Sequence, residues 1–203
     1  MAGKKTSGRA ADKKPSRKPR ADAARNRERV LEAARTVFGA GAADASLEAV
    51  ARTAGVGIGT LYRHFPTREA LFEAVYRNEA EQMATLAKRL EREAKPIDAL
   101  HQWMHSFVRF VATKKGMVGA LALVVSKDSA LFSYSSDLLT RAIDELRTRA
   151  VNAGEIRDDI SAEDLLHTLV AICYAHDHSG WQESALRLVD VFVDGLRKRR
   201  AIR

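Results

Sequence analysis

Residues 46–65 read SLEAVARTAGVGIGTLYRHF, and their pattern predicts two short helices joined by a tight turn. Apolar residues at i, i+3, i+4 and i+7 give the first helix one buried face, formed by Leu47, Val50, Ala51 and Ala54. Ser46 can cap this helix, and Gly55 can end it, because a residue without Cβ enters the left-handed conformation at little cost. This is the layout of a helix-turn-helix, whose second helix lies in the major groove of DNA.

The second helix of this stretch presents groups that suit DNA on its outer side. Gly57 and Gly59 allow the backbone to come close to another surface, and the outward side chains offer hydroxyl, guanidinium and imidazole groups: Thr60, Tyr62, Arg63 and His64. No carboxylate occurs from Ala49 to Thr67, as expected of a surface that meets phosphates. The alternative from the residues alone is a helical hairpin packed inside an all-α domain, with the glycines serving only as caps.

The run GVGIGTLYRHFPTREALFEAV, residues 55–75, resembles the DNA-binding domain of the tetracycline-repressor (TetR) family of bacterial transcriptional regulators. The resemblance covers roughly residues 25–80. Two positions depart from the family pattern. Gly57 stands where Ser or Thr is usual, so a hydroxyl that could cap the helix and contact phosphate is missing. Arg68 stands where Lys is common, which preserves a positive charge directed at phosphate.

The resemblance implies an all-α, homodimeric transcriptional regulator, expected to be a repressor, whose head binds one half-site of a pseudo-palindromic operator. It implies a helix-turn-helix domain over 21–80 and a helical effector-binding and dimerisation domain over 81–203. Residues 1–20 are basic, rich in Ser, Gly and Pro, and without apolar periodicity, which predicts a disordered tail before them. A long helix after Pro66 joins the two domains.

The candidate DNA contacts fall into two groups. Those expected near base edges are Ile58, Gly59, Thr60 and Arg63. Those expected to contact mainly phosphates or to bring the backbone close are Arg25, Arg27, Ser46, Gly57, Tyr62, His64 and Arg68.

The net charge of +8 is distributed unevenly. The first 20 residues hold eight basic side chains and one acidic one, so a single net positive charge remains for residues 21–203. The tail could be a basic arm that reaches DNA, or a solubilising segment that adds only weak, salt-sensitive affinity. The charge argument for DNA binding therefore depends on the motif rather than on the isoelectric point.

The cysteine count and the lack of long apolar runs limit the class of protein. The one cysteine, Cys173, excludes an internal disulfide, which fits a reducing cytoplasm. No apolar run approaches the ~18 residues needed to span a bilayer, and no secretory signal is apparent at the N-terminus. We expect a cytoplasmic protein without a membrane partner.

Amphipathic helices are predicted throughout the rest of the chain. Asp22 can cap the first, which ends at Phe38, and Thr67 can cap the long helix after Pro66. A short core helix is predicted over 117–125, and Ser161 can cap the next-to-last helix. The last two start near Ser161 and Gln182, and their apolar stripes are wide enough to suggest a dimer interface; its candidates are Leu165, Leu169, Ile172, Leu186, Val189, Phe192, Val193 and Leu196. The alternative is that both stripes are buried within their own subunit.

A pocket for a small apolar or amphipathic effector is expected in the C-terminal domain. His101 and His105, four apart on one helical face, are its polar candidates, although such histidines are more often satisfied by nearby carbonyls. The full candidate set is His101, Trp103, Met104, His105, Phe107, Met117, Leu121 and Tyr174. His176, Asp177 and His178 near Cys173 could suggest a metal, but the two histidines point in different directions on a helix, so neither a metal site nor a cofactor is predicted.

The sequence contains no recognisable Ser–His–Asp arrangement, phosphate loop or paired carboxylates, so we predict no enzyme. The second hypothesis is a small all-α enzyme or a general nucleoid-binding protein that uses its tail. Such a nucleoid protein would bind unrelated duplexes almost equally, whereas a regulator should prefer its own site by roughly 10³-fold or more.

Overall fold

The computed structural model describes residues 18–39, 46–116, 130–175 and 178–198. Over these ranges the chain is helical, and the only β-type pairing there is one isolated bridge between Ile156 and Arg197. The helices are α1 (Lys18–Gly39), α2 (Leu47–Ala54), α3 (Ile58–His64), α4 (Arg68–Glu93), α5 (Pro96–Gly116), α7 (Ala130–Asn152), α8 (Ala162–Tyr174) and α9 (Trp181–Leu196). The predicted all-α fold is confirmed.

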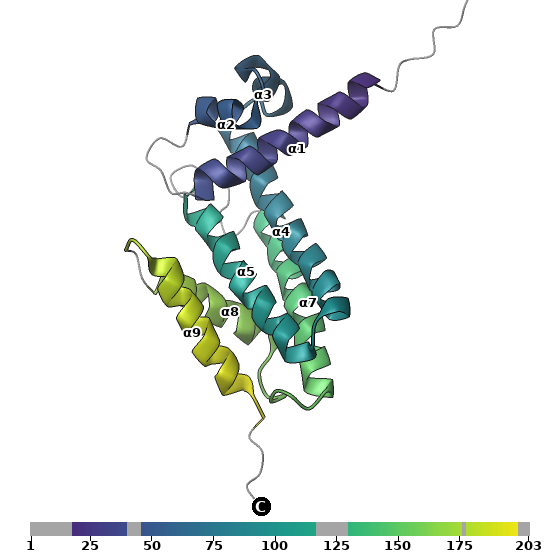
Figure 1. Ribbon diagram of the computed structural model, residues 1–203, viewed down its shortest axis with the longest axis vertical. Helices are drawn as coiled ribbons and strands as arrows, with labels where there is room; N and C mark the ends of the chain where they lie inside the picture. The colour runs from purple at the N-terminus through teal and green to yellow at the C-terminus, as the bar shows by residue number, and fades with distance from the viewer. Residues whose placement is uncertain (1–17, 40–45, 117–129, 176–177, 199–203) are drawn as a thin grey trace, which may run out of the picture.

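The helices form a head and a body (Figure 1). The head consists of α1, α2 and α3, and α4 begins beneath it and runs down into the body. The body is built from the rest of α4 with α5 and α7, and α8 and α9 pack on these from one side. Helix α1 contacts both α4 and α5, so the head sits directly on the two helices that enter the body.

Side-chain caps explain why three of the helices begin where they do. The Ser46 hydroxyl accepts a hydrogen bond from the Ala49 amide, and the Thr67 hydroxyl accepts one from the Ala70 amide, each over 3.1 Å. Ser161 forms a capping box with Asp164, in which each side chain binds the other residue's backbone N–H. All three were predicted as caps.

The boundaries of α1 differ from the sequence-based expectation. Asp22 was expected to cap a helix that begins there, but α1 begins at Lys18, inside the segment predicted to be disordered. Asp22 instead lies within the first turns of α1 and forms an ion pair with Arg25, three residues later. Residues 1–17, most of the predicted tail, lie outside the described residues, as does the core helix predicted over 117–125.

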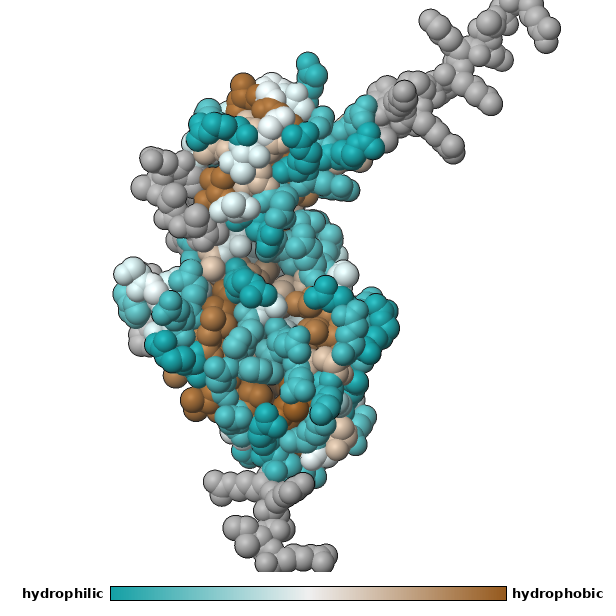
Figure 2. All heavy atoms as spheres, in the orientation of Figure 1, coloured by the Kyte–Doolittle hydropathy of each residue, from teal (hydrophilic) through white to brown (hydrophobic). Residues whose placement is uncertain are grey.

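One hydrophobic core runs through head and body. Phe38 and Phe72 are fully buried where α1 meets α4, and Trp103 is fully buried in the body, where its indole N–H donates to the Met83 carbonyl over 2.9 Å. Figure 2 shows hydrophilic residues over much of the visible surface, with hydrophobic residues gathered in patches on the body. Of the helices described, none has the length and hydrophobicity needed to cross a membrane.

Candidate DNA-binding surface and ligand cavity

The turn between α2 and α3 is fixed by Gly55. Its φ of 63° and ψ of 37° place it in the left-handed region, as predicted for a helix end. The Gly55 amide donates to the Arg52 carbonyl and the Val56 amide donates to the Ala51 carbonyl, which is the Schellman pattern. A guanidinium N–H of Arg29 in α1 donates to the Gly55 carbonyl over 3.2 Å, so α1 also holds the turn.

Helix α3 has one buried side and one exposed side. Leu61 and the following Phe65 are buried against the rest of the head, and Val56 in the turn packs partly against the same core. Ile58 and Tyr62 face outward with 40% and 45% of their surface exposed, which is high for large apolar or aromatic side chains. Exposed side chains of this size on a short helix are available for contact with another molecule.

The other candidate contacts on α3 lie on or beside its exposed side. Gly57, Gly59 and Arg63 are exposed, and Thr60 and His64 are half-buried. Gly57 is the N-cap in an extended conformation and provides no side-chain cap. A Cβ added at either glycine would meet no atom within 4 Å, so both leave open space along this surface.

The remaining candidates surround α3, and several already have partners within the head. The guanidinium of Arg27 lies 5.5 Å from the centre of the Phe65 ring, and that of Arg68 lies 5.2 Å from the centre of the Phe72 ring. Both rings belong to the core, so these contacts hold two exposed cations beside α3. Ser46 is occupied as the cap of α2, and Arg25 lies on α1 in its pair with Asp22.

Comparison with known proteins agrees with this arrangement. Residues 30–75 match the model for bacterial regulatory proteins of the tetR family, and residues 95–198 match the C-terminal domain of SbtR-like transcriptional regulators. The chain belongs to the TetR family of bacterial transcriptional regulators. It is accordingly a DNA-binding regulator, and regulators of this family bind operator DNA and dimerise.

Two solved TetR-family structures are similar over most of their length. The regulator SCO0520 from Streptomyces coelicolor is 41% identical, with a TM-score of 0.77 over 86% of this chain and 99% of that one. A TetR regulator from Mycobacterium vanbaalenii is 35% identical, with a TM-score of 0.71 over 89% of this chain and 99% of that one. The HTH-type regulator UidR of Escherichia coli strain K12 is 27% identical over 158 residues, which are 73% of this chain and 78% of UidR.

The joint between head and body lies along one side of α4. Phe72 packs against Phe38 of α1 with ring centres 4.7 Å apart. Two turns further on, a carboxylate oxygen of Glu79 lies 3.7 Å from the Arg35 side chain of α1 but accepts no hydrogen bond from the described residues. Burial, as the largest effect, raises the pKa of Glu79 above its ordinary value, and the Arg35 charge opposes that rise.

A cavity of about 730 Å³ lies in the body, and its α4 wall is Tyr76, between Phe72 and Glu79. Its size suits a small organic molecule. Its walls come from α4, α5, α7 and α8 and are mostly apolar or aromatic: Tyr76, Phe107, Phe110, Val111, Lys114, Phe132, Ser136, Leu139, Thr140, Glu163, Leu166, His167, Val170 and Tyr174.

Lys114 is the cation of this cavity. Its ammonium nitrogen lies 5.6 Å from the centre of the Tyr76 ring and 5.7 Å from that of Phe132, and it has no ion pair with a described residue. Burial lowers the pKa of Lys114 and raises that of Tyr76 to about 12. An anionic group entering the cavity would restore a partner for this desolvated charge.

The structure divides the effector-site candidates between three places. Phe107 and Tyr174 line the cavity. Trp103 and Met104 are fully buried in the core, and His101 and His105 lie on a different side of α5. Met117 and Leu121 lie outside the described residues. The lining residues on α7, and those on α8 other than Tyr174, were missed because no local spacing shows which sides of distant helices converge on one cavity.

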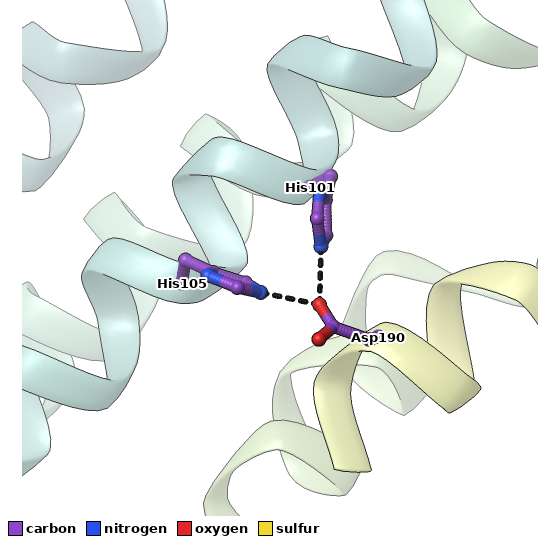
Figure 3. Close-up of side chains that lie close together, drawn as sticks. All are labelled: His101, His105 and Asp190. Carbon is purple, nitrogen blue, oxygen red and sulfur yellow. Dashed lines mark hydrogen bonds and ion pairs between the residues drawn. The ribbon is translucent and has the colours of Figure 1, made fainter. Parts of the chain in front are cut away.

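His101 and His105 instead face α9 (Figure 3). Their Nε2 atoms lie 2.7 Å and 2.6 Å from the same Asp190 carboxylate oxygen. These hydrogen bonds, first that of His101 and then that of His105, lower the pKa of the Asp190 carboxyl. Cys173, by contrast, is a buried thiol whose pKa burial raises to about 12, so it suits packing rather than metal binding.

The dimer candidates are mostly turned inward. Five are buried within the subunit: Leu165, Leu169, Val189, Val193 and Leu196. Ile172, Leu186 and Phe192 are half-buried against the same core. The apolar stripes of α8 and α9 are wide because each helix packs against two others of the same subunit. Helices α5 and α7 cover α8, and α5 and α8 cover α9. A buried stripe cannot contact a second subunit without repacking.

The outward side of α9 carries a separate stripe of small and apolar residues. Leu188 is 39% exposed and Val191 is 69% exposed, the largest value among the exposed large hydrophobic residues described. With Ser184 and Gly195 they follow the i, i+4, i+7, i+11 spacing of one helical face. We call these four residues the outer α9 stripe.

Proposed function

We propose that this regulator is a homodimeric repressor that leaves its operator when a small amphipathic molecule enters the cavity below the head. The observation that supports release most strongly is the position of α4. Its Phe72 packs against the head, and its Tyr76, one turn later on the same side, lines the cavity. An occupant that displaces Tyr76 would therefore act on the helix that supports α1.

Helix α3 is the proposed recognition helix. Ile58, Gly59, Thr60 and Arg63 would lie near base edges, where an Arg can form a bidentate contact with guanine. Tyr62 and His64, with Arg25, Arg27, Ser46, Gly57 and Arg68 around them, would position the head mainly through phosphates. Support comes from the exposed side of α3 and from the two arginines held over core rings beside it.

The proposed dimer uses the outer α9 stripe together with the outward side of α8. Ala171 is exposed and Ile172 half-buried on α8, so small and apolar groups are available on both helices. Two copies related by a two-fold axis would pair these surfaces and place two heads on the two half-sites of a pseudo-palindrome. The half-buried candidates Leu186 and Phe192 would lie at the margin of this interface.

The chemistry of the cavity indicates the class of effector. The aromatic and aliphatic walls suit an apolar body, and Lys114 suits an anionic or strongly hydrogen-bond-accepting group on it. Glu163 and His167 add polar groups at the α8 side. A ligand releases DNA only if it binds the DNA-incompetent state more tightly, because equal affinity for both states shifts nothing.

The cavity can be tested with anilinonaphthalene sulfonate, a fluorescent probe with an aromatic body and one anionic group. We expect the dimer to bind it with enhanced fluorescence, and Lys114→Met to weaken binding about tenfold. Lys95→Met, at an exposed lysine outside the cavity, is the matched control and should change nothing. Equal affinities for all three proteins would contradict the proposed anionic end of the cavity.

Release is tested by adding the same probe to the protein–operator complex. The proposal expects the probe to lower operator affinity in the wild type and less so in Lys114→Met. If the dimer keeps its full operator affinity when saturated with the probe, the proposed coupling between cavity and head through α4 is contradicted for anionic aromatic ligands of this kind. A reporter promoter carrying the selected operator then tests repression: deletion of the regulator should raise transcription, and a fall would show activation.

A further inference from the structure

His101, His105 and Asp190 bring three metal-binding side chains together from two helices (Figure 3). The two histidines are one turn apart on α5, and Asp190 projects from α9. One ligand atom from each lies within 4.8 Å of the others. Both Nε2 atoms are directed at a single oxygen of Asp190, and the two rings stand edge to face with centres 4.3 Å apart.

The three side chains are accessible to an ion from solution. About a third of each imidazole side chain and half of the Asp190 side chain are exposed. The histidines also border a groove of about 310 Å³ between α4 and α5, which Arg89 and Arg109 line as well. The positive charges of these guanidinium groups repel a cation. A metal ion would therefore stay here only through direct bonds to the imidazole nitrogens and the carboxylate oxygen.

The types of ligand select the class of metal. Two imidazoles and one carboxylate suit Zn²⁺ and the neighbouring transition metals, whereas Mg²⁺ and Ca²⁺ prefer sites made of oxygens. Ligand distances near 2.0–2.1 Å require the nitrogen–oxygen separations to open to about 3 Å or slightly more. Half-exposed side chains can make this adjustment without moving the helices.

We propose that His101, His105 and Asp190 bind one divalent transition-metal ion of the Zn²⁺ class, with water in the remaining positions. The ion replaces the hydrogen-bonding protons between the imidazoles and the carboxylate. It then fastens α9, which carries the outer stripe, to α5, which lines the cavity. The alternative is a cluster held by hydrogen bonds only.

The test uses the full chain after removal of metals with a chelator. Titration with Zn²⁺ by calorimetry should give one site per chain, and Co²⁺ should give visible absorption bands typical of a site with nitrogen and oxygen ligands. Asp190→Asn keeps an oxygen that can accept hydrogen bonds from both histidines but is a much poorer metal ligand. Since loss of an outer-shell partner alone costs 10–100-fold in affinity, we expect Asp190→Asn and His105→Gln each to lose about 100-fold.

Glu183→Gln is the matched control, because Glu183 is an exposed carboxylate on the same helix as Asp190 but outside the three-residue cluster. It should bind Zn²⁺ like the wild type. Circular dichroism of each metal-free variant tests the helical fold, and saturating Zn²⁺ should raise the melting temperature of the wild type but not of Asp190→Asn. Equal Zn²⁺ affinity in wild type and Asp190→Asn, or no binding by the wild type, would overturn the proposal and leave a hydrogen-bonded cluster only.

Discussion

The functional side chains of the head lie on its surface, whereas those of the body are partly buried. In the head, the groups that can meet DNA lie on the outside of α3, over a core that they do not enter. In the body, the groups of interest are partly buried between helices: Lys114 in the cavity, Glu79 beneath α1, and His105 against α9. Substitutions on the outside of the head can therefore alter DNA binding alone, whereas those in the body alter stability and function together.

A charge in the outer α9 stripe should have the largest effect. Val191→Glu would bury two like charges across a two-fold interface, which costs several kcal/mol and corresponds to at least about 100-fold in the dimer dissociation constant. We expect a monomer by light scattering and loss of full-operator affinity with the head intact. Thr148→Glu, on an exposed side of α7, is the control. A stable Val191→Glu dimer would place the interface elsewhere.

Gly55→Ala tests the head through its turn rather than its surface. The left-handed conformation costs a residue with a Cβ about 1–2 kcal/mol, and that Cβ would also lie 2.6 Å from an Arg29 side-chain nitrogen. We expect the free energy of unfolding to fall by about that amount in urea denaturation. Gly59→Ala, inside α3 with open space around it, is the control and should not lower the free energy of unfolding. Equal losses at both glycines would contradict this account of the turn.

Glu79→Gln should have a smaller effect, and one that depends on pH. Because burial raises the pKa of Glu79, the folded protein keeps this proton to a higher pH than the unfolded chain does. The wild type therefore loses stability relative to Glu79→Gln as pH rises from near the ordinary carboxyl pKa of 4.5. At pH 7 we expect the variant to be more stable by about 1 kcal/mol, because its neutral amide avoids the cost of a buried charge.

Urea denaturation at pH 4.5 and at pH 7 measures this difference. If the stability advantage of Glu79→Gln over the wild type is the same at both pH values, or smaller at pH 7, then Arg35 fully compensates the buried charge of Glu79. Arg35 retains its bonds to Glu32 in the variant, so the substitution does not leave an unpaired cation.

The sequence predicted the head better than the body, because the head is specified by local signals. Ser46, Gly55 and Thr67 each act on backbone groups within four residues, so their roles follow from spacing alone. The prediction that Asp22 caps a helix was wrong. An acidic residue three positions before Arg25 can either cap a helix or pair with that arginine inside a longer helix, and the spacing is the same in both cases.

The body depends on contacts that spacing does not record. Apolar periodicity identified Val189 and Val193 as a buried stripe, but not that α5 and α8 of the same subunit bury it. The pair His101 and His105 was recognisable as one helical face, whereas Asp190, 85 residues beyond His105, has no local signal that joins it to them. The same holds for Lys114 and the α7 and α8 residues that share its cavity.

Selection of bound duplexes from a random library, followed by titration of the selected site, tests the central claim most directly. We expect a pseudo-palindrome bound by one dimer at least roughly 10³-fold more tightly than an unrelated duplex. Arg63→Ala should relax preference at particular positions by about 1–3 kcal/mol, whereas Tyr62→Phe should weaken all sites by similar factors. Equal affinity for selected and unrelated duplexes, or a uniform loss in Arg63→Ala, would contradict sequence reading by α3.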